Sequence, residues 1–474
     1  MLNPELNRIP ENVRTVHLIA ACGTAMAALA CMLKELGYHV TGSDRNVYPP
    51  MSDLLAERGI AIASGFSEDN LAYGPDLVVV GNAVTRDNPE AKKTGEMGLP
   101  YCSMPQAISR FAAAERNVLM VCGTHGKTTT ASILTGILHA AGLDPSFLIG
   151  GVVRDFNSNF RLGNGPHIVL EGDEYDTAFF DKGPKFLHYH PVATILTSVE
   201  FDHADIFTDL AAVKHSFDRL LSGLDRDSTV LAFDADDNVS QLVRDRDCRI
   251  VRYGRHKDST WQLGRVSVQP PRTEFEIIRS GRVFGCFSTP LIGRHNLYNA
   301  LAAVAVADSI GVSPEAVSSA LGAFGGVKRR QEIRGVKNGV IVMDDFAHHP
   351  TAVAETLAGV RSAYPAVRLI AVFEPRTNTS IRDIFQEDYA RAFDKADMIC
   401  ISHPPDPGKA PEGHRFSSER LTADLSGRGK TAFSFKNADE IVDFLIPGAR
   451  PDDLILVMSN GGFDNIHEKL LAKL

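Results

Sequence analysis

The residues best suited to chemistry form a glycine-rich loop, Gly123 to Thr130, that reads GTHGKTTT. The loop follows an apolar stretch, Val118 to Cys122, and precedes a run that favours a helix from Thr129. Backbone N–H groups of such a loop, together with the N-terminus of the next helix, hold phosphate oxygens. The pattern predicts Lys127 on the β- and γ-phosphates of a nucleoside triphosphate and the Thr128 hydroxyl on Mg²⁺. The other predicted ATP-binding residues of the loop are Gly123, Thr124, Gly126 and Thr129.

This loop is a shortened form of the common phosphate-binding pattern G-x-x-x-x-G-K-[ST]. That pattern places a glycine five residues before Gly126, where this chain has Val121. We therefore expect Gly123 to make the turn and Lys127 to lie in an exposed loop. The alternative is a glycine turn with a surface lysine, which the strand–loop–helix order makes the weaker interpretation.

Two acidic clusters follow predicted strands downstream of the loop. The first, EGDEYD from Glu171, follows 167–170, and the second, EFDHAD at 200–205, follows 193–197. Either cluster alone is more typical of a solvated turn, but a neighbouring phosphate loop favours Mg²⁺, which needs few protein carboxylates. His188 and His190 lack the further cysteine or histidine of a zinc site, and their role stays open.

Strand–helix patterns start three times along the chain, near Thr15, Val118 and Val340. Such alternation is typical of parallel sheets with crossover helices, and residues 226–290 alternate more like β-structure. The sequence therefore predicts an α/β protein of three domains: a Rossmann-like N-terminal domain (1–112), a central P-loop ATPase-type domain with a mixed or parallel sheet (113–324) and a Rossmann-like C-terminal domain (325–474).

The first of these units carries an incomplete dinucleotide-binding turn. Only Gly23 fits the fingerprint, and Asp44 ends the second predicted strand, where an acid can bind a ribose hydroxyl. Taken alone, the turn weakly indicates a nicotinamide cofactor. Cys22 is expected to be a packing residue, because the sequence places no histidine or acid beside it.

Composition narrows the class of protein. The 474 residues are 44% hydrophobic and 23% charged, which excludes a disordered chain, a collagen and a coiled coil. The formal net charge is 49 − 58 = −9, and no basic run indicates nucleic acid. The seven cysteines form no close pair, and we find no signal-peptide core and no apolar span of ~20 residues. We therefore expect a cytoplasmic protein without a membrane span.

Six motifs taken together resemble the Mur ligases, the ATP-dependent amide-bond ligases of bacterial cell-wall synthesis. In chain order they are GTHGKTTT (123–130), the acidic motif from Glu171, EFDHAD (200–205), GRHNLYNALAA (293–303), KRRQE (328–332) and DDFAHHPT (344–351). The histidine-bearing motifs are most similar to the branch that uses UDP-N-acetylmuramate as acceptor. A folate polyglutamate ligase shares the three-domain plan but is not expected to carry DDFAHHPT.

The resemblance implies ATP and Mg²⁺ as cofactors and assigns roles to residues by their motifs. The implied Mg²⁺ ligands are Thr128, Glu171 and His203. The implied ATP contacts outside the loop are Asn296 for adenine, Asp345 for the ribose, and Arg330 or its neighbour Arg329 for the γ-phosphate. The implied contacts of the UDP-sugar are Gly23, Thr24, Asp44, Asn82 and His125. Lys214 does not match the offset from His203 of the carbamylated lysine of several Mur ligases, so we do not include it.

The catalytic residues that the resemblance implies are Lys127, His203, His348 and Arg330. His348 is expected to orient the incoming amine, and a neutral imidazole, with a pKa of roughly 6.5, can also accept its proton. Without the resemblance, a capped turn before Pro350 is the alternative interpretation of His348 and His349.

Departures from the alanine-adding ligases of that branch favour a larger amine. Thr377 and Ser380 stand where those enzymes have arginines for the carboxylate of a free amino acid, and the stretch 179–191 is longer. With the segment 46–55, these features resemble the murein peptide ligases, which recycle L-alanyl-γ-D-glutamyl-meso-diaminopimelate. The resemblance implies UDP-N-acetylmuramate and this tripeptide as small-molecule partners, and a monomer or weak homodimer. The alternatives are ligation of L-alanine and a non-ligase, nucleotide-binding regulatory protein.

Overall fold

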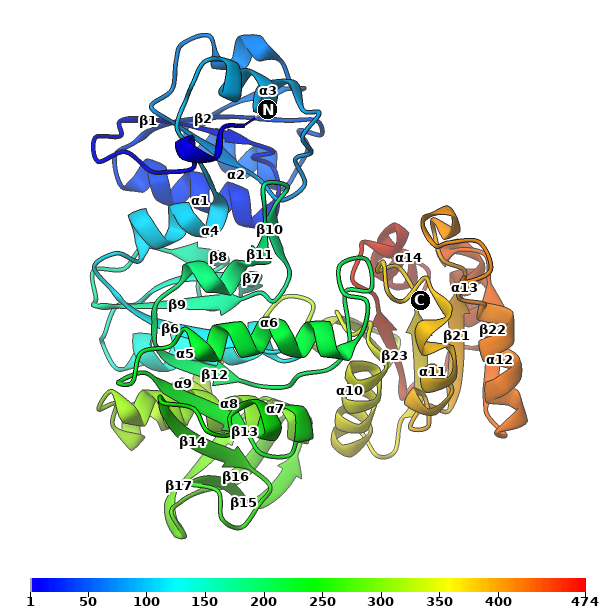
Figure 1. Ribbon diagram of the computed structural model, residues 1–474. Coiled ribbons are helices and arrows are strands. Elements are labelled where there is room, and N and C mark those ends of the chain that lie inside the picture. The colour runs from blue at the N-terminus through cyan, green and yellow to red at the C-terminus, as the bar shows by residue number, and fades with distance from the viewer. Residues whose placement is uncertain (1) are drawn as a thin grey trace. The chain divides into compact units, whose positions relative to one another are not determined.

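The computed structural model describes residues 2–474 and contains two compact units (Figure 1). The first holds the chain up to Val199 together with Ala211–Ser259 and Ala302–Val317, and the second holds Glu200–Leu210, Thr260–Leu301 and Ser318–Leu474. The first unit thus contains the whole predicted N-terminal domain and most of the predicted central domain, and the borders predicted at 112 and 324 stay predictions.

The first unit begins with a five-stranded parallel sheet in the order β3-β2-β1-β4-β5. The order reverses at β1, which pairs with β2 on one side and β4 on the other, and a crevice forms beyond the carboxyl ends of strands at such a point. The strands are β1 (Thr15–Ile19), β2 (His39–Asp44), β3 (Ala61–Ser64), β4 (Leu77–Val80) and β5 (Tyr101–Ser103), and the helices are α1 (Thr24–Glu35), α2 (Met51–Glu57), α3 (Pro89–Glu96) and α4 (Met104–Ala107).

A second run of strands in this unit has the order β14-β13-β12-β6-β9-β7-β8, parallel except for β8. A separate hairpin pairs β10 with β11. The bounds are β6 (Asn117–Cys122), β7 (Ser146–Val153), β8 (Ser158–Arg161), β9 (His167–Gly172), β10 (Asp176–Ala178), β11 (Asp181–Pro184), β12 (Pro191–Leu196), β13 (Thr229–Phe233) and β14 (Arg249–Gly254), with α5 (Lys127–Ala140), α6 (Leu210–Ser222) and α7 (Asp237–Leu242).

The second unit contains an antiparallel set, β15 (Trp261–Gln269), β16 (Arg272–Arg279) and β17 (Arg282–Thr289), and a six-stranded sheet. That sheet has the order β18-β19-β23-β20-β21-β22 and is parallel except for β18. Its strands are β18 (Glu332–Lys337), β19 (Val340–Asp345), β20 (Arg368–Phe373), β21 (Met398–Ser402), β22 (Thr431–Phe435) and β23 (Asp453–Met458).

Helices cover both faces of the six-stranded sheet, which is coloured yellow to red in Figure 1. One core cluster joins it to α10 (Pro350–Ala363), α11 (Gln386–Ala392) and α12 (Ser418–Gly427), and another joins it to α13 (Ala438–Leu445) and α14 (Ile466–Lys473). All six residues of β23 are buried, as expected for a central strand with both faces covered. The remaining helices are α8 (Arg294–Ser309) and α9 (Pro314–Ala323).

The predicted α/β elements are confirmed with small shifts at their ends. The strands expected near residues 15, 118, 167, 193 and 340 all form, and most of 226–290 is β-structure. One shift matters for chemistry, because α5 begins at Lys127 rather than at Thr129. Lys127 is therefore the first residue of a helix, directly after the turn at Gly126.

Candidate functional site

The phosphate loop turns at Gly123, as predicted. Gly123 has φ = +125° and Gly126 has φ = +79°, both in the region that favours glycine. A Cβ at position 123 would lie 2.2 Å from Thr197 Oγ1 and 2.8 Å from the Ser198 backbone nitrogen. The Thr124 N–H donates to the Ser198 carbonyl over 2.9 Å, and the His125 N–H donates to Ser198 Oγ over 3.0 Å. The end of β12 therefore holds the loop in shape.

Lys127 is not exposed, which corrects the prediction from the sequence. Its ammonium lies 3.0 Å from Glu174 Oε2 and donates to the Gly123 carbonyl over 2.6 Å, and its side chain is only 13% exposed. Burial by itself would lower the pKa of Lys127, but Glu174 and Asp173 outweigh burial and raise that pKa. Lys127 thus keeps its positive charge at the mouth of the phosphate loop.

Thr128 and Glu171, both predicted Mg²⁺ ligands, lie together. The Thr128 hydroxyl donates to Glu171 Oε2 over 3.3 Å, and the Gly150 N–H donates to Glu171 Oε1 over 2.7 Å. Burial and the neighbouring Asp173 raise the pKa of Glu171. Hydroxyl and carboxylate oxygens suit Mg²⁺, and a cation would relieve the repulsion between the two acids, so these residues fit the ion. His203 lies in the second unit, and its part in the metal site stays a prediction.

Two charged residues beside the loop, Glu174 and Lys185, are not among the site residues predicted from the sequence. Glu174, 2% exposed, is the partner of Lys127, and Lys185 Nζ lies 3.1 Å from Asp173 Oδ2 and 4.0 Å from the centre of the Tyr175 ring. Burial opposes ionisation of Asp173, but Lys185 and Lys127 lower its pKa. The acidic motif itself pointed to Glu174, whereas no spacing rule pointed to Lys185, which is twelve residues from its partner.

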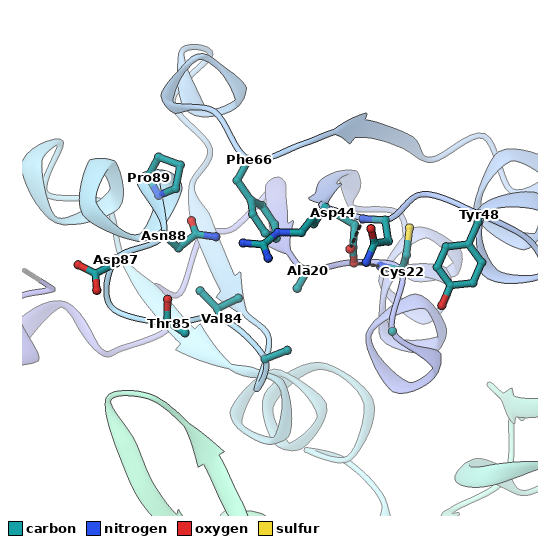
Figure 2. A pocket seen from close by; sticks show the side chains of 14 residues that line it. Ala20, Cys22, Asp44, Tyr48, Phe66, Val84, Thr85, Asp87, Asn88 and Pro89 are labelled. Atoms are coloured by element: carbon teal, nitrogen blue, oxygen red, sulfur yellow. Dashed lines mark hydrogen bonds between the residues drawn. The ribbon is translucent and has the colours of Figure 1, made fainter. Parts of the chain in front are cut away.

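A pocket of about 550 Å³ occupies the crevice of the five-stranded sheet. In Figure 2, Cys22, Asp44 and Tyr48 lie on one side of the pocket and Val84, Thr85, Asp87, Asn88 and Pro89 on the other, with Phe66 between them. Two of the predicted UDP-sugar residues, Gly23 and Asp44, line this pocket. The pocket lies where a doubly wound sheet binds a nucleotide.

The other predicted UDP-sugar residues do not line this pocket. Thr24 begins α1, and the Asn82 amide donates to the Asp176 carbonyl of the β10–β11 hairpin over 2.9 Å. Asp44 shapes the pocket by holding the turn between β1 and α1, because its carboxylate accepts from the Cys22 N–H over 2.8 Å. Burial, followed by the charge of Asp44, raises the pKa of Cys22, which fits a packing residue rather than a nucleophile.

The histidine pair of the second unit separates into two roles. His349 is the N-cap of α10: its Nδ1 accepts from the Thr351 N–H over 3.3 Å, and its Nε2 lies 3.2 Å from the Phe201 carbonyl. His348 Nδ1 lies 3.0 Å from the Phe346 carbonyl, and its Nε2 lies 3.6 Å from Asp202 Oδ2. The capped-turn interpretation therefore holds for His349.

Asp202 carries a negative charge beside His348. Burial opposes that charge, but His348 and, at longer range, His203 and His349 hold the pKa of Asp202 well below its usual value. The Thr379 hydroxyl donates to Asp202 Oδ1 over 2.9 Å, which fixes the carboxylate.

Gln331 connects two predicted ATP contacts. Its side-chain oxygen accepts from the Asn296 amide over 3.1 Å, and its N–H donates to Asp345 Oδ2 over 2.8 Å. Burial raises the pKa of Asp345, and the charge of Arg330 opposes that effect. Arg329 Nη2 donates to the carbonyls of Ser459 and Gly461 over 2.6 and 2.7 Å, and Arg330 lies over the Phe346 ring, 4.8 Å from its centre, so the phosphate contact of either arginine stays a prediction.

Four further side chains singled out in the sequence have partners in the fold. Thr377 Oγ1 lies 2.8 Å from Ser380 Oγ, and Ser380 is 1% exposed, so position 380 has no room for an arginine. Lys214 donates to Gln241 Oε1 over 2.6 Å. His188 Nε2 lies 2.7 Å from Asp181 Oδ2, which indicates that it stabilises the hairpin.

Among residues 2–474, no helix has both the length and the apolar character that a membrane crossing requires. Three family models match consecutive parts of the chain: the Mur ligase family catalytic domain at 15–116, the Mur ligase middle domain at 121–307 and the Mur ligase glutamate ligase domain at 329–461.

Curated relatives and solved structures agree with these matches. The Escherichia coli K12 UDP-N-acetylmuramate–L-alanyl-gamma-D-glutamyl-meso-2,6-diaminoheptandioate ligase is 41% identical over 458 residues, which cover 96% of this chain and 97% of the relative. A murein peptide ligase structure from Psychrobacter arcticus is 35% identical with a TM-score of 0.71, covering 97% of this chain and 98% of that one. A UDP-N-acetylmuramate–L-alanine ligase from Burkholderia ambifaria is 33% identical over 97% of this chain and 98% of the relative. The chain belongs to the Mur ligase family, and its three predicted α/β domains are those of that family.

Proposed function

We propose that this chain is an ATP-dependent ligase that joins the lactyl carboxylate of UDP-N-acetylmuramate to the amine of L-alanyl-γ-D-glutamyl-meso-diaminopimelate. The observation that carries the proposal is the 41% identity to the Escherichia coli enzyme of that name across 96% of the chain. The phosphate loop, the buried acids beside it and the pocket in the first sheet provide places for ATP and the UDP-sugar.

The reaction needs an activated carboxylate, because a free carboxylate does not acylate an amine. A lactyl oxygen attacks the γ-phosphorus of ATP, and ADP leaves as the acyl phosphate forms. The amine nitrogen then attacks the acyl carbon, loses a proton, and expels inorganic phosphate as the amide bond forms. Catalysis of this kind depends on positioning and on neutralising negative charge.

The first step falls to the phosphate loop. Lys127 brings a permanent positive charge to the β- and γ-phosphates. These phosphates replace Glu174, which is the ion-pair partner of Lys127 in the structure. Thr128 and Glu171 would hold Mg²⁺, which supplies further neutralisation of phosphate charge. Arg330, whose charge acts on the neighbouring Asp345, is the proposed γ-phosphate contact.

The second step falls to His348. In the neutral tautomer that carries its proton on Nδ1, which the Phe346 carbonyl can accept, His348 has an unprotonated Nε2 that can take a proton from the amine. The imidazolium that results lies 3.6 Å from the ionised Asp202, which stabilises it. His348 is therefore the proposed base, and Asp202 its positioning partner.

The proposed setting is the cytoplasm of a bacterium that recycles its cell wall. All seven cysteines are free thiols, as expected in a reducing compartment. ATP and Mg²⁺ are the proposed cofactors, and UDP-N-acetylmuramate and the tripeptide are the proposed partners, with no nucleic acid.

An assay of ADP release against a panel of amines tests the proposal. The purified chain, ATP, Mg²⁺ and UDP-N-acetylmuramate are supplied with tripeptide, with L-alanine, or with no amine. We expect one ADP per amide bond with tripeptide and little with alanine. Alanine accepted alone would instead indicate the activity of the relatives that are 29–33% identical. No ADP release with any amine would indicate a nucleotide-binding regulatory protein.

A further inference from the structure

Glu90 is a buried acid close to the pocket of the first sheet. It lies in the first turn of α3, is 0% exposed, and does not line the pocket, whereas its neighbours Asn88 and Pro89 do. A carboxylate at such depth is costly unless its oxygens accept several hydrogen bonds. Glu90 meets that requirement, and its partners indicate what it is for.

Each oxygen of the Glu90 carboxylate has two partners. Oε1 accepts from the Ser67 N–H over 3.1 Å and from the Asn70 amide over 2.6 Å. Oε2 accepts from the Ser43 hydroxyl over 2.5 Å and lies 3.4 Å from His17 Nε2. These partners come from β1, β2 and the segment after β3, so one side chain connects four separate parts of the first sheet.

Three of those parts are walls of the pocket. Ser43 directly precedes Asp44, which lines one side; Ser67 directly follows Phe66, which lies between the two sides; and Glu90 itself follows Pro89 on the opposite side (Figure 2). Since adjacent residues move together, the position of Glu90 sets the distances between Asp44, Phe66 and Pro89.

We propose that Glu90 is a positioning residue for UDP-N-acetylmuramate, holding the walls of the nucleotide crevice in register without touching the substrate. The inference rests on the proposed function for the identity of the ligand. Glu90 sets the spacing of the crevice walls and therefore the affinity for the UDP-sugar. The transfer of phosphate and the attack of the amine take place elsewhere in the chain.

The geometry of the two oxygens decides which substitutions Glu90 tolerates. Both partners of Oε1, the Ser67 N–H and the Asn70 amide, can only donate, so an acceptor must face them. The partners of Oε2 can change roles, because a hydroxyl donates or accepts and the histidine has two tautomers. Glutamine satisfies this arrangement, with its oxygen on the Oε1 side and its amide on the Oε2 side. Leucine leaves both donors without an acceptor, which the segment 65–70 can relieve only by moving or by admitting water.

Asp76 provides a matched control in the same sheet. It directly precedes β4, and its Oδ2 accepts from the N–H groups of Arg14 and Thr15 over 2.9 and 2.8 Å. These bonds lie at the amino ends of β1 and β4, whereas the pocket lies beyond their carboxyl ends. Asp76→Ala therefore removes a comparable set of hydrogen bonds without affecting the crevice.

The test compares Glu90→Leu, Glu90→Gln and Asp76→Ala in the full chain, with KM for each substrate, kcat, the Kd of UDP by calorimetry, and Tm. We expect Glu90→Leu to raise KM for UDP-N-acetylmuramate and the Kd of UDP about tenfold or more, with kcat and KM for ATP within about twofold of wild type. Glu90→Gln should stay within about threefold of wild type throughout. Asp76→Ala should lower Tm and leave KM for the UDP-sugar unchanged.

Three results would overturn the inference. The first is a KM for UDP-N-acetylmuramate that is the same in Glu90→Leu as in Asp76→Ala, and the second is a rise in that KM in Glu90→Gln as large as in Glu90→Leu. The third is an equal loss of affinity for all substrates in Glu90→Leu. If Glu90→Leu does not fold, Asn70→Ala removes one donor from the same oxygen, and an unchanged KM in that variant also contradicts it. A wild-type chain that turns over no UDP-N-acetylmuramate refutes the proposed function instead, and the Kd of UDP then still tests the role of Glu90.

Discussion

Lys127 and Glu174, 47 residues apart, form an ion pair of 3.0 Å in which both side chains are largely buried. The lysine that the phosphate loop provides for ATP is therefore already neutralised by an acid of the chain itself. In the proposed reaction the phosphates of ATP replace Glu174 as the partner of Lys127, and Glu174 stays in the same acidic motif as Glu171, the proposed metal ligand. This exchange connects nucleotide binding to the stability of the loop.

Lys127→Ala is expected to lose at least about 100-fold in kcat, because a charge facing the γ-phosphate disappears. It is also expected to lose about 3–5 kcal/mol of unfolding free energy, since Glu174 stays buried without its partner. The double variant Lys127→Met/Glu174→Gln should recover most of that free energy and none of the activity. Urea unfolding and the ADP assay measure the two effects, and a fully stable Lys127→Ala enzyme would contradict the paired burial.

Glu171→Gln is expected to remove the stabilisation by Mg²⁺ while making the metal-free protein more stable at neutral pH. Burial and Asp173 raise the pKa of Glu171, so its ionised form lowers stability, and that loss grows as the pH rises through the raised pKa. A cation offsets the loss only where the carboxylate is charged. Thermal melts with and without MgCl₂ and ADP, at pH values from 5 to 8, measure this dependence.

The control for this variant is Glu35→Gln. Glu35 ends α1 and forms an exposed ion pair with Arg58. The melts of this control should keep the wild-type response to Mg²⁺ at every pH. A Glu171→Gln protein with that same response would show that the ion binds elsewhere.

His348→Ala is expected to lose mainly activity, and His349→Ala mainly stability. Loss of the proposed base should lower kcat about 100-fold or more while KM for ATP stays near wild type. Loss of the α10 cap should cost about 1 kcal/mol of unfolding free energy, with a smaller effect on kcat. His349→Asn retains a capping side chain and should restore stability. Equal kcat values for the two alanine variants would contradict the separation of roles.

Thr377→Arg is expected to be tolerated and to improve the use of L-alanine, since it returns one cation to the position facing a free carboxylate in the alanine-adding ligases. Ser380→Arg is expected to unfold the loop, because Ser380 is 1% exposed and bonded to Thr377. kcat/KM for alanine and for tripeptide, with Tm as the control, measures both. If a folded Thr377→Arg enzyme keeps the wild-type preference for tripeptide over alanine, position 377 does not decide whether the carboxylate of a free amino acid is bound.

The sequence by itself determined the parts of this protein whose physics is local. Apolar runs such as Leu77–Val80 and Leu454–Met458 predict buried parallel strands, because only such strands are apolar on both faces. Gly123, which directly follows an apolar run, and Gly126, which directly precedes Lys127, predict the phosphate loop, because glycine readily adopts the positive φ that such a turn needs. Neighbouring motifs then identified the family.

The tertiary structure alone decided which groups each buried charge meets. Lys127 meets Glu174, His348 meets Asp202, and Glu90 meets Ser43 and Ser67, all across long stretches of chain. No periodicity or spacing encodes these pairs, since the distance along the chain between two strand ends says nothing about their distance in a sheet. The exposure predicted for Lys127 was wrong for this reason: burial depends on what packs over a residue, and that partner lies in another element.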